Sequence, residues 1–161
     1  MTIKVGDKVP SVTLRHLNAE GGVNAVSSDD YFKGKTVALF ALPGAYTRTC
    51  SSRHLPGYVT NAEALKAKGV DEIACLSVND AFVMGAWGKE HNAAGKVTML
   101  GDGSCEFTQG VGLTVDRTEA GMGIRSQRYS MVVKDGVVSE LNVEPSGEYG
   151  VSSAEAMVAR R

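Results

Sequence analysis

Three segments of the chain are almost continuously apolar, which is the pattern of strands buried on both faces of a sheet. They are Thr36–Leu42 (TVALFAL), Glu72–Val78 (EIACLSV) and the shorter Val97–Leu100. Parallel strands covered by helices on both sides have this composition. Because Pro43 and Gly44 stop the first run, we predict that it ends there and forms the central strand of the sheet.

Helical periodicity fills the stretches between these runs. Apolar residues recur at intervals of three and four from Cys50 to Lys68, and Pro56 should kink that helix. A second helix is predicted over Ala81–His91, where Asn79 or Asp80 can cap the first turn. Shorter helices are predicted at three further places: Ser28–Phe32, near Glu106–Val111, and Ser152–Ala159.

Segments near both ends of the chain add antiparallel pairing. Val9–Leu17 alternates loosely between apolar and polar residues and is predicted to be an edge strand. Arg128–Lys134 and Val137–Val143 enclose Asp135-Gly136, a dipeptide that strongly favours a tight hairpin.

The order of these elements predicts the fold class. Strand, helix, strand, helix and strand, followed by a hairpin and a last helix, indicate an α/β protein with a mixed sheet. This order matches a thioredoxin-like fold, in which helices flank a central mixed β-sheet. No repeat, low-complexity tract or linker divides the sequence, so residues 1–161 are predicted to form a single domain.

Composition argues against several classes of partner. Seventeen Lys and Arg residues against 18 Asp and Glu residues leave a net charge of -1, which gives no field to gather nucleic acid or an anionic membrane. No stretch approaches the roughly 20 apolar residues of a membrane span, and Met1–Pro10 has no apolar run of the kind found in secretory signals. We therefore expect neither nucleic acid nor a membrane as a partner.

The cysteines indicate a reducing compartment. Cys50, Cys75 and Cys105 are odd in number and far apart, which argues against a disulfide framework and predicts a cytoplasmic protein. With three histidines and no close cysteine pair, no metal site is expected. The Gly-rich crossing at Gly121–Gly123 begins like a dinucleotide fingerprint but lacks its last glycine, so no cofactor is expected either.

The strongest chemical signal follows the predicted central strand. The segment from Phe40 to Cys50 runs through the Pro43-Gly44 turn into the first turn of the long helix. Ligand sites of open α/β sheets lie beyond the carboxyl ends of their strands, and a helix start favours a thiolate at Cys50 through free N–H groups and the helix dipole. The hydroxyl of Thr47 can point into the same cavity, and the N–H groups of the turn can hold substrate oxygens.

An arginine supplies the second signal. Arg128 precedes a strand that otherwise reads Tyr-Ser-Met-Val-Val, and a guanidinium at the head of a buried strand needs an anion or the protein rim. If this strand lies beside the central one, Arg128 can reach Cys50 and stabilise its thiolate. Arg125 is the competing candidate for this role.

These residues belong to a longer pattern, LPGAYTRTCSSRHLPGY at residues 42–58. It resembles the active-site signature of peroxiredoxins of the type-five group, which includes the plant type II enzymes. The resemblance extends over nearly the whole chain through further matches: ACLSVNDAFVM at 74–84, Trp87-Gly88 and RYSMVV at 128–133. The resemblance is specific because the spacing of Pro43, Thr47 and Cys50 occurs together with the distant Arg128 in its expected strand.

The resemblance implies a thiol peroxidase that reduces hydrogen peroxide and alkyl hydroperoxides. Cys50 would be the peroxidatic cysteine, and Thr47 would hydrogen-bond the peroxide. Pro43 and Gly44 would line the peroxide pocket, where Pro43 excludes water. Arg128 would stabilise the thiolate and align the O–O bond. The family also implies an external thiol reductant and a homodimer.

Two residues near the nucleophile leave their roles open. Arg48 stands where many relatives have proline, and it adds a charge at the pocket mouth. His54, four residues after Cys50, could share a helix face with it, either as an auxiliary group or as a rim or packing histidine.

Reduction of the oxidised cysteine is expected to need a second molecule. Some relatives carry a resolving cysteine before the last helix, where this chain has Ser152 and Ser153. Cys75 is expected to be an inert core thiol, whereas Cys105 follows a turn in a more exposed setting and is the internal candidate. We expect a single-cysteine cycle resolved by glutathione, with or without glutaredoxin, and thioredoxin is the other donor considered.

Three other functions stay open at this point. The chain could be a peroxide-sensing redox signalling protein with little turnover, a Cys-His hydrolase that uses Cys50 and His54, or a thioredoxin-like binding module. Steady-state peroxide consumption separates a sensor from a peroxidase. The hydrolase is disfavoured because no Asn or Asp is placed to orient the histidine.

Overall fold

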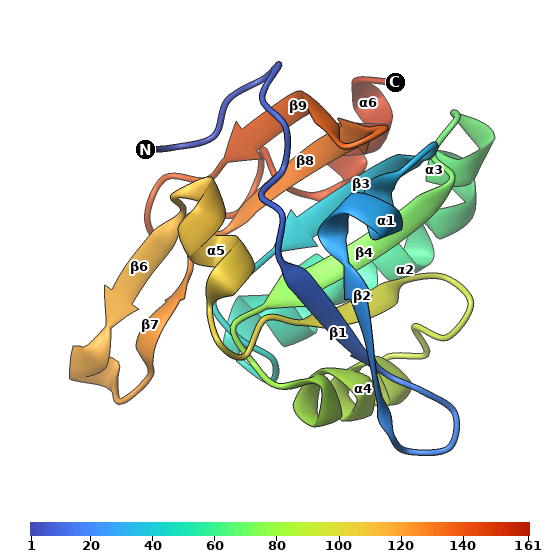
Figure 1. The fold of residues 1–161 in the computed structure, drawn as a ribbon. Coiled ribbons are helices and arrows are strands. Elements are labelled where there is room, and N and C mark those ends of the chain that lie inside the picture. The colour runs from blue at the N-terminus through green and yellow to red at the C-terminus, as the bar shows by residue number, and fades with distance from the viewer.

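A mixed sheet of seven strands forms the centre of the computed structural model, which describes all 161 residues (Figure 1). From edge to edge the strand order is β2-β1-β5-β4-β3-β8-β9. The strands of this sheet are β1 (Thr13–Leu17), β2 (Val23–Ser27), β3 (Thr36–Ala41), β4 (Glu72–Ser77), β5 (Thr98–Gly101), β8 (Tyr129–Lys134) and β9 (Val137–Val143).

Six α-helices flank the sheet, and a separate hairpin projects from it (Figure 1). The helices are α1 (Ser28–Phe32), α2 (Leu55–Thr60), α3 (Ala62–Ala67), α4 (Ala81–Glu90), α5 (Glu106–Val111) and α6 (Ala154–Ala159). The hairpin is a two-stranded sheet of β6 (Thr114–Arg117) and β7 (Gly123–Ser126), joined by a short 3-10 turn.

Strand directions confirm the predicted thioredoxin-like α/β fold. β3, β4 and β5 run parallel because helices cross over between them, and β8 pairs antiparallel with β3. The β8–β9 hairpin turns at Asp135 (φ 48°) and Gly136 (φ 81°). Positive φ at both central residues is the geometry that Asp-Gly favours in a tight hairpin.

The sheet separates two hydrophobic clusters, because alternate residues of each strand face opposite sides. One cluster packs under α2, α3, α4 and α6 and includes Cys50, Cys75 and Trp87. The other packs under α1 and α5 and includes Phe32 and Phe107. Cys50 therefore lies on the α2 side of the sheet, away from α5.

Three sequence predictions at the sheet need correction. Val9–Leu17 is not an edge strand: only Thr13–Leu17 is extended, and it lies between β2 and β5. Strand β2 had no hydrophobic signal because its residues are mostly exposed. The run from Thr36 forms β3, which is next to the middle strand β4 rather than central itself, and the β6–β7 hairpin was not predicted.

The long helix predicted over Cys50–Lys68 is divided into three pieces. It starts with a π-turn (Cys50–His54), in which the N–H of Leu55 donates to the C=O of Cys50. Pro56 has no N–H to offer to the carbonyl four residues earlier, which accounts for the wider turn before it. A second break follows at Asn61, whose side-chain amide donates to the C=O of Gly57 at 2.8 Å.

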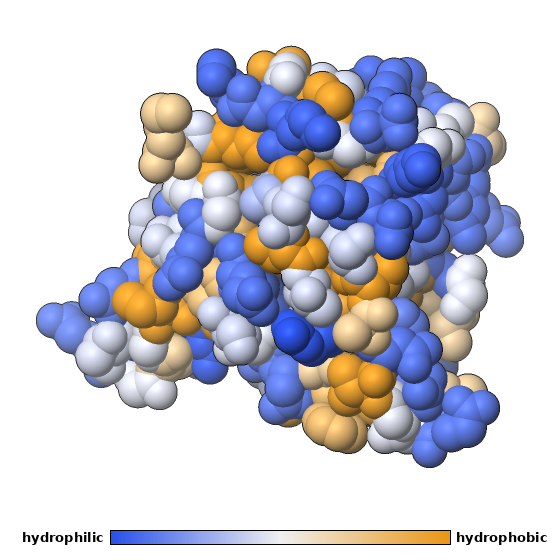
Figure 2. Space-filling model, viewed as in Figure 1, coloured by the Kyte–Doolittle hydropathy of each residue, from blue (hydrophilic) through white to orange (hydrophobic).

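Hydrophobic residues on the face drawn in Figure 2 occur as separate patches among hydrophilic ones. The buried apolar residues form the two clusters on either side of the sheet. None of the helices combines the length and the apolar character that crossing a bilayer requires.

Candidate active site

The loop between β3 and the π-turn is held in place by three neighbouring elements. The N–H of Ala45 donates to Oδ1 of Asn79, which follows β4, at 3.0 Å. The guanidinium of Arg125 on β7 donates to the C=O of Pro43 at 3.1 Å. Tyr46 has a positive φ of 67° and donates from its hydroxyl to Glu90 of α4 at 3.1 Å. These contacts fix the approach of the chain to Cys50.

Cys50 meets Arg128 as the sequence predicted. Cys50 is fully buried in the first turn of the helix, and Arg128 immediately precedes β8, the antiparallel neighbour of β3. The Nη2 of Arg128 donates to the Sγ of Cys50 at 3.1 Å. The guanidinium carries a fixed positive charge, so Arg128 presents a cationic hydrogen-bond donor to the sulfur.

His54 holds the same guanidinium from its other side. The Nη1 of Arg128 lies 2.8 Å from Nδ1 of His54, and Nε2 of His54 lies 3.1 Å from the C=O of Ser152. Because a guanidinium can only donate, Nδ1 accepts and the proton of the imidazole sits on Nε2. His54 therefore orients Arg128 as a neutral ring.

Burial and the charge of Arg128 together lower the pKa of His54 to about 3. The ring is fully buried and packs against Phe40, Tyr58 and Tyr149. A histidine whose free lone pair faces a guanidinium is not available as a base for Cys50. This geometry argues against a Cys-His hydrolase and places His54 against Arg128 as an auxiliary group that is also packed among aromatic rings.

A buried carboxylate supports this array from behind. Glu144 is 7% exposed and accepts hydrogen bonds from the N–H of Gly150 at 2.6 Å and from Ser152, through its N–H at 2.8 Å and its hydroxyl at 2.7 Å. Although burial raises the pKa of Glu144, these bonds outweigh it and lower the pKa below its ordinary value. The fixed Ser152 carbonyl then accepts from His54 and from Tyr58.

Thr47 and Gly44 shape the loop at the entrance. The hydroxyl of Thr47 donates to the C=O of Gly44 at 2.7 Å, so its oxygen lone pairs remain for a donor from outside. A Cβ on Gly44 would approach Nη1 of Arg125 to 2.7 Å, so a larger residue there would push the guanidinium away from the C=O of Pro43. Arg125 thus supports the loop and is not the partner of Cys50.

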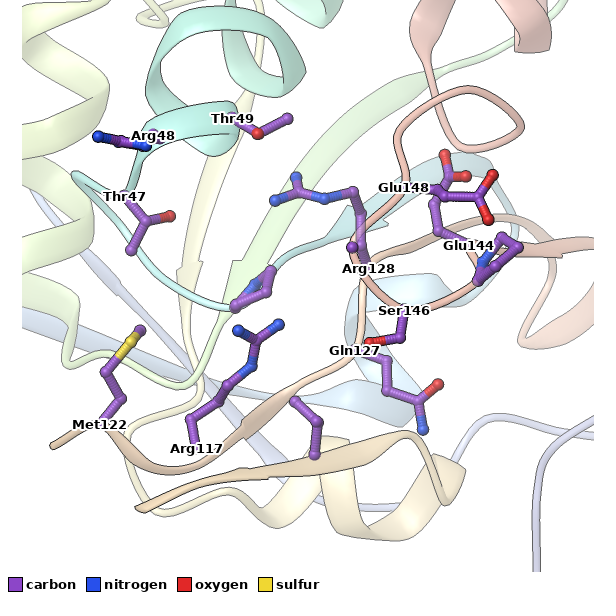
Figure 3. A pocket seen from close by; sticks show the side chains of 14 residues that line it. Thr47, Arg48, Thr49, Arg117, Met122, Gln127, Arg128, Glu144, Ser146 and Glu148 are labelled. Atoms are coloured by element: carbon purple, nitrogen blue, oxygen red, sulfur yellow. The ribbon is translucent and has the colours of Figure 1, made fainter. Parts of the chain in front are cut away.

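A cavity of about 520 Å³ opens beside these residues. Figure 3 shows Thr47 and Arg128 on its wall, with Arg117 of β6 and Met122 before β7 on the hairpin side. Arg48 lies at the rim, as expected from the sequence. The sequence-predicted site residues Pro43, Thr47 and Arg128 therefore come together around one cavity, and Arg128 connects it to the buried Cys50.

The other two cysteines have different surroundings, and all three are free thiols. Cys75 on β4 is fully buried, and desolvation raises the pKa of its thiol well above the ordinary value. Cys105, expected in an exposed setting, is instead only 7% exposed at the start of α5. It was misjudged because the turn before it is attached to the sheet, where the N–H of Asp102 donates to the C=O of Ser77 at the end of β4.

Comparisons with known proteins agree with this geometry. The family model described as Redoxin matches residues 4–158. Peroxiredoxin-2B of Arabidopsis thaliana is 46% identical over 153 residues, which are 95% of this chain and 94% of that protein. Hybrid peroxiredoxin hyPrx5 of Haemophilus influenzae is 45% identical in an alignment of 161 positions, which covers 98% of this chain and 66% of that protein.

A solved structure is similar over the full fold. Reduced Prx3 in complex with H2O2 from Vibrio vulnificus is 49% identical, with a TM-score of 0.94 and 99% of both chains covered. The fold and the site thus define a redoxin with a thioredoxin-like core. Within that class the chain belongs to the peroxiredoxins of the type II, or type-five-like, group, which are thiol peroxidases acting on a peroxide and a thiol reductant.

Several residues of the site carried no sequence signal. Glu144 and Ser152 act through a loop contact that has no periodicity. Arg117 and Met122 reach the cavity because the unpredicted hairpin folds over it.

Replacing His54 by Gln tests its neutral, buried role. The folded pKa of about 3 lies below the ordinary 6.5, so the unfolded chain takes up a proton in this interval while the folded chain does not. The free energy of unfolding therefore falls as the pH drops through this interval. Between about pH 6.5 and about pH 4.5 the parent should lose about 2 to 3 kcal/mol relative to His54→Gln, which cannot titrate.

Urea unfolding of both proteins across this pH range measures the difference. Glutamine is a fair replacement because its carbonyl can accept from Arg128 and its amide can donate to Ser152. Parallel stability curves for parent and variant would contradict the neutral assignment.

Proposed function

We propose that Cys50 is the nucleophile with which this peroxiredoxin reduces hydrogen peroxide and alkyl hydroperoxides. The observation that carries the proposal is the 3.1 Å hydrogen bond from Arg128 to the Cys50 sulfur, beside a cavity that Thr47 also lines. A buried sulfur that faces a guanidinium and has no other assigned task is suited to react as a thiolate.

In the first step the Cys50 thiolate attacks one oxygen of the peroxide. A sulfur–oxygen bond forms, the O–O bond breaks, and the leaving oxygen departs as water or an alcohol after it takes up a proton. Cys50 is oxidised to a sulfenic acid, and the peroxide is reduced by two electrons.

The surrounding groups supply the positioning. Thr47 accepts a hydrogen bond from the peroxide, because its own proton is engaged by Gly44. Arg128 stabilises the thiolate and the charge that develops on the peroxide oxygens. Pro43 excludes water from the pocket wall, and Gly44 allows the loop to approach Arg125 closely. His54 is a positioning residue that acts through Arg128.

The second step is proposed to be intermolecular. A glutathione thiolate attacks the Cys50 sulfur, a disulfide forms and the sulfenic oxygen leaves as water. A second glutathione then attacks this disulfide, releases the Cys50 thiolate and leaves as oxidised glutathione. If glutaredoxin attacks instead, it takes up the glutathionyl group, and a further glutathione removes that group as oxidised glutathione. Thioredoxin is the competing donor.

The placement of the other side chains supports a single-cysteine cycle. Cys105 adjoins α5, which packs on the opposite face of the sheet from Cys50. Cys75 shares the Cys50 cluster, but its raised pKa keeps it a thiol and thus a poor nucleophile at neutral pH. Ser152 and Ser153, where some relatives carry a resolving thiol, offer hydroxyl groups, and both residues are buried.

A bulky reductant needs access that the folded helix start does not give. The Cys50 sulfur is fully buried, so a glutathione molecule can reach it only when the first turn opens. The π-turn is the piece of the helix with the irregular bonding pattern, and we propose that it opens at this stage. The same burial admits a small peroxide more readily than a thiol.

The cellular setting and assembly are also proposals. Three free thiols fit the reducing cytoplasm. A homodimer is consistent with large apolar side chains left exposed near the active-site loop, Tyr46 at 49% and Phe82 at 58%. A peroxide sensor with little turnover would use the same Cys50, and its steady-state rate with any thiol would be negligible.

Replacing Cys50 by Ser should abolish peroxide consumption, because no other thiol has a cationic hydrogen-bond donor. Cys75→Ser is the matched control and should keep most of the turnover, since Cys75 is expected to act only as a core side chain. Peroxide consumption with glutathione and glutaredoxin, and separately with thioredoxin, measures both variants. Substantial turnover by the Cys50 variant would refute the mechanism, and negligible turnover by the parent would favour the sensor.

Replacing Arg128 by Met should slow the oxidation of Cys50 without unfolding the protein. A charge-assisted hydrogen bond contributes roughly 1.5 to 3 kcal/mol, so the rate constant should fall about ten- to a hundredfold. Arg128→Lys keeps the charge but not the two-pronged geometry. Its rate constant for oxidation by peroxide should therefore lie between those of the parent and of Arg128→Met. If peroxide reacts equally fast with Arg128→Met, the role proposed for Arg128 in the peroxide step is wrong and the arginine is structural.

Oxidation with one equivalent of peroxide and no added thiol should leave a sulfenic acid at Cys50. A dimedone-type probe should trap it, and glutathione should convert it to a mixed disulfide one glutathione heavier. Peptide mass mapping decides the outcome. A dominant crosslink from Cys50 to Cys105 or Cys75, lost together with turnover when that cysteine is replaced by Ser, would show that the cycle uses two cysteines.

A further inference from the structure

The lining of the cavity beside Cys50 contains three arginines and two carboxylates, those of Glu144 and Glu148, and the peroxide step uses only one of the arginines. The three arginines are Arg48, Arg117 and Arg128. The five ion pairs of the structure involve other basic residues, so none of these three guanidinium groups is paired with a carboxylate. Arg128 is engaged with Cys50 and His54, which leaves Arg48 and Arg117 without a task.

Arg48 and Arg117 reach the cavity from different elements. Arg48 is exposed and belongs to the turn that leads into Cys50, whereas Arg117 ends β6 and is half-buried. Figure 3 shows the Arg117 side chain extending toward the side of the cavity where Thr47 and Arg128 lie, with Arg48 next to Thr47. Neither Arg48 nor Arg117 donates a side-chain hydrogen bond, because all the bonds of this kind come from other arginines of the chain.

We propose that Arg48 and Arg117 form a carboxylate-binding subsite, which holds a small carboxylate-bearing reactant with its reactive end toward Cys50. A guanidinium presents its N–H groups in the planar fork that a carboxylate matches. The cavity, at about 520 Å³, is large for hydrogen peroxide alone and lies within the range of about 300–1,000 Å³ of small-molecule sites. The inference rests on the proposed function, because the bound molecule takes part in the Cys50 cycle.

Two reactants of that cycle can carry a carboxylate. One is a thiol of the glutathione class, and the other is the hydroperoxide of a free fatty acid. Glu148 is exposed on the cavity wall, and Figure 3 places it across the cavity from Arg48. A negative group opposite the arginines suits the ammonium group of glutathione. The shared chemistry is the carboxylate, and the two arms of the experiment separate its sources.

Trp87 provides the readout for each half of the cycle. It is the single tryptophan of the chain, and its Nε1 donates to the hydroxyl of Ser51 at 3.0 Å, next to Cys50. Its fluorescence should change when Cys50 is oxidised and return when Cys50 is reduced. Stopped-flow traces therefore give separate rate constants for peroxide and for thiol.

The experiment compares free acids with their esters on the parent, Arg48→Met, Arg117→Met and the double variant. The reduction arm uses glutathione and glutathione diethyl ester. The oxidation arm uses a fatty-acid hydroperoxide and its methyl ester. In at least one arm the parent should prefer the free acid by about tenfold, each single variant should reduce that preference about three- to fivefold, and the double variant should lose it.

Arg53→Met is the matched control. It removes the same charge from the π-turn, but Arg53 points to Tyr149 and does not line the cavity. This variant should keep the parental preference, which distinguishes a bound carboxylate from general attraction to a positive surface. Loss of the preference in Arg53→Met to the same extent as in the double variant would overturn the subsite.

The two arms assign the source, and other results overturn the proposal. A preference confined to the reduction arm assigns the carboxylate to the thiol, and one confined to the oxidation arm assigns it to the hydroperoxide. Equal rates for acid and ester in both arms, or a preference that survives the double variant, would refute the subsite. Oxidation by hydrogen peroxide and reduction by dithiothreitol should persist in the double variant, whereas failure of the parent in these two reactions would refute the proposed function instead.

Discussion

The contact between Arg128 and the Cys50 sulfur determines which groups can surround them in the rest of the site. A cationic group beside a fully buried sulfur must be kept from carboxylates that would compete for it, yet its remaining N–H groups still need acceptors. A neutral histidine meets both demands, because His54 offers one lone pair and no charge. The His54 imidazole is buried because the Arg128 guanidinium requires an uncharged hydrogen-bond acceptor at this position.

The support continues outward to a part of the chain far from Cys50 in sequence. Glu144 ties down the segment that precedes α6 through three hydrogen bonds, and that segment offers the Ser152 carbonyl to His54. The N–H of Glu144 also donates to the C=O of Arg128. The hairpin of β8 and β9 and the loop before α6 therefore act jointly to position the Arg128 guanidinium, although neither of them supplies the nucleophile.

The sequence was informative where chemistry and local pattern coincide. Buried strands, the Asp-Gly hairpin and the Cys50 helix start each leave a signal within a few residues, and Arg128 was found because a charge at the head of an apolar strand is conspicuous. The π-turn, strand β2 and the β6–β7 hairpin escaped because exposed or irregular segments have little hydrophobic periodicity. The contacts of Glu144 could not be predicted from the sequence, because they depend on how the loop before α6 folds back onto the end of β9.

The position of Cys105 next to α5, which packs on the other face of the sheet from Cys50, and the raised pKa of Cys75 have a consequence for oxidative damage. In the proposed single-cysteine cycle, the sulfenic acid at Cys50 persists until a thiol arrives from solution. If a second peroxide arrives first, the sulfur advances to sulfinic acid, which ordinary thiols do not reverse. The fraction of inactivated molecules then records how often peroxide has outpaced the supply of reducing thiol.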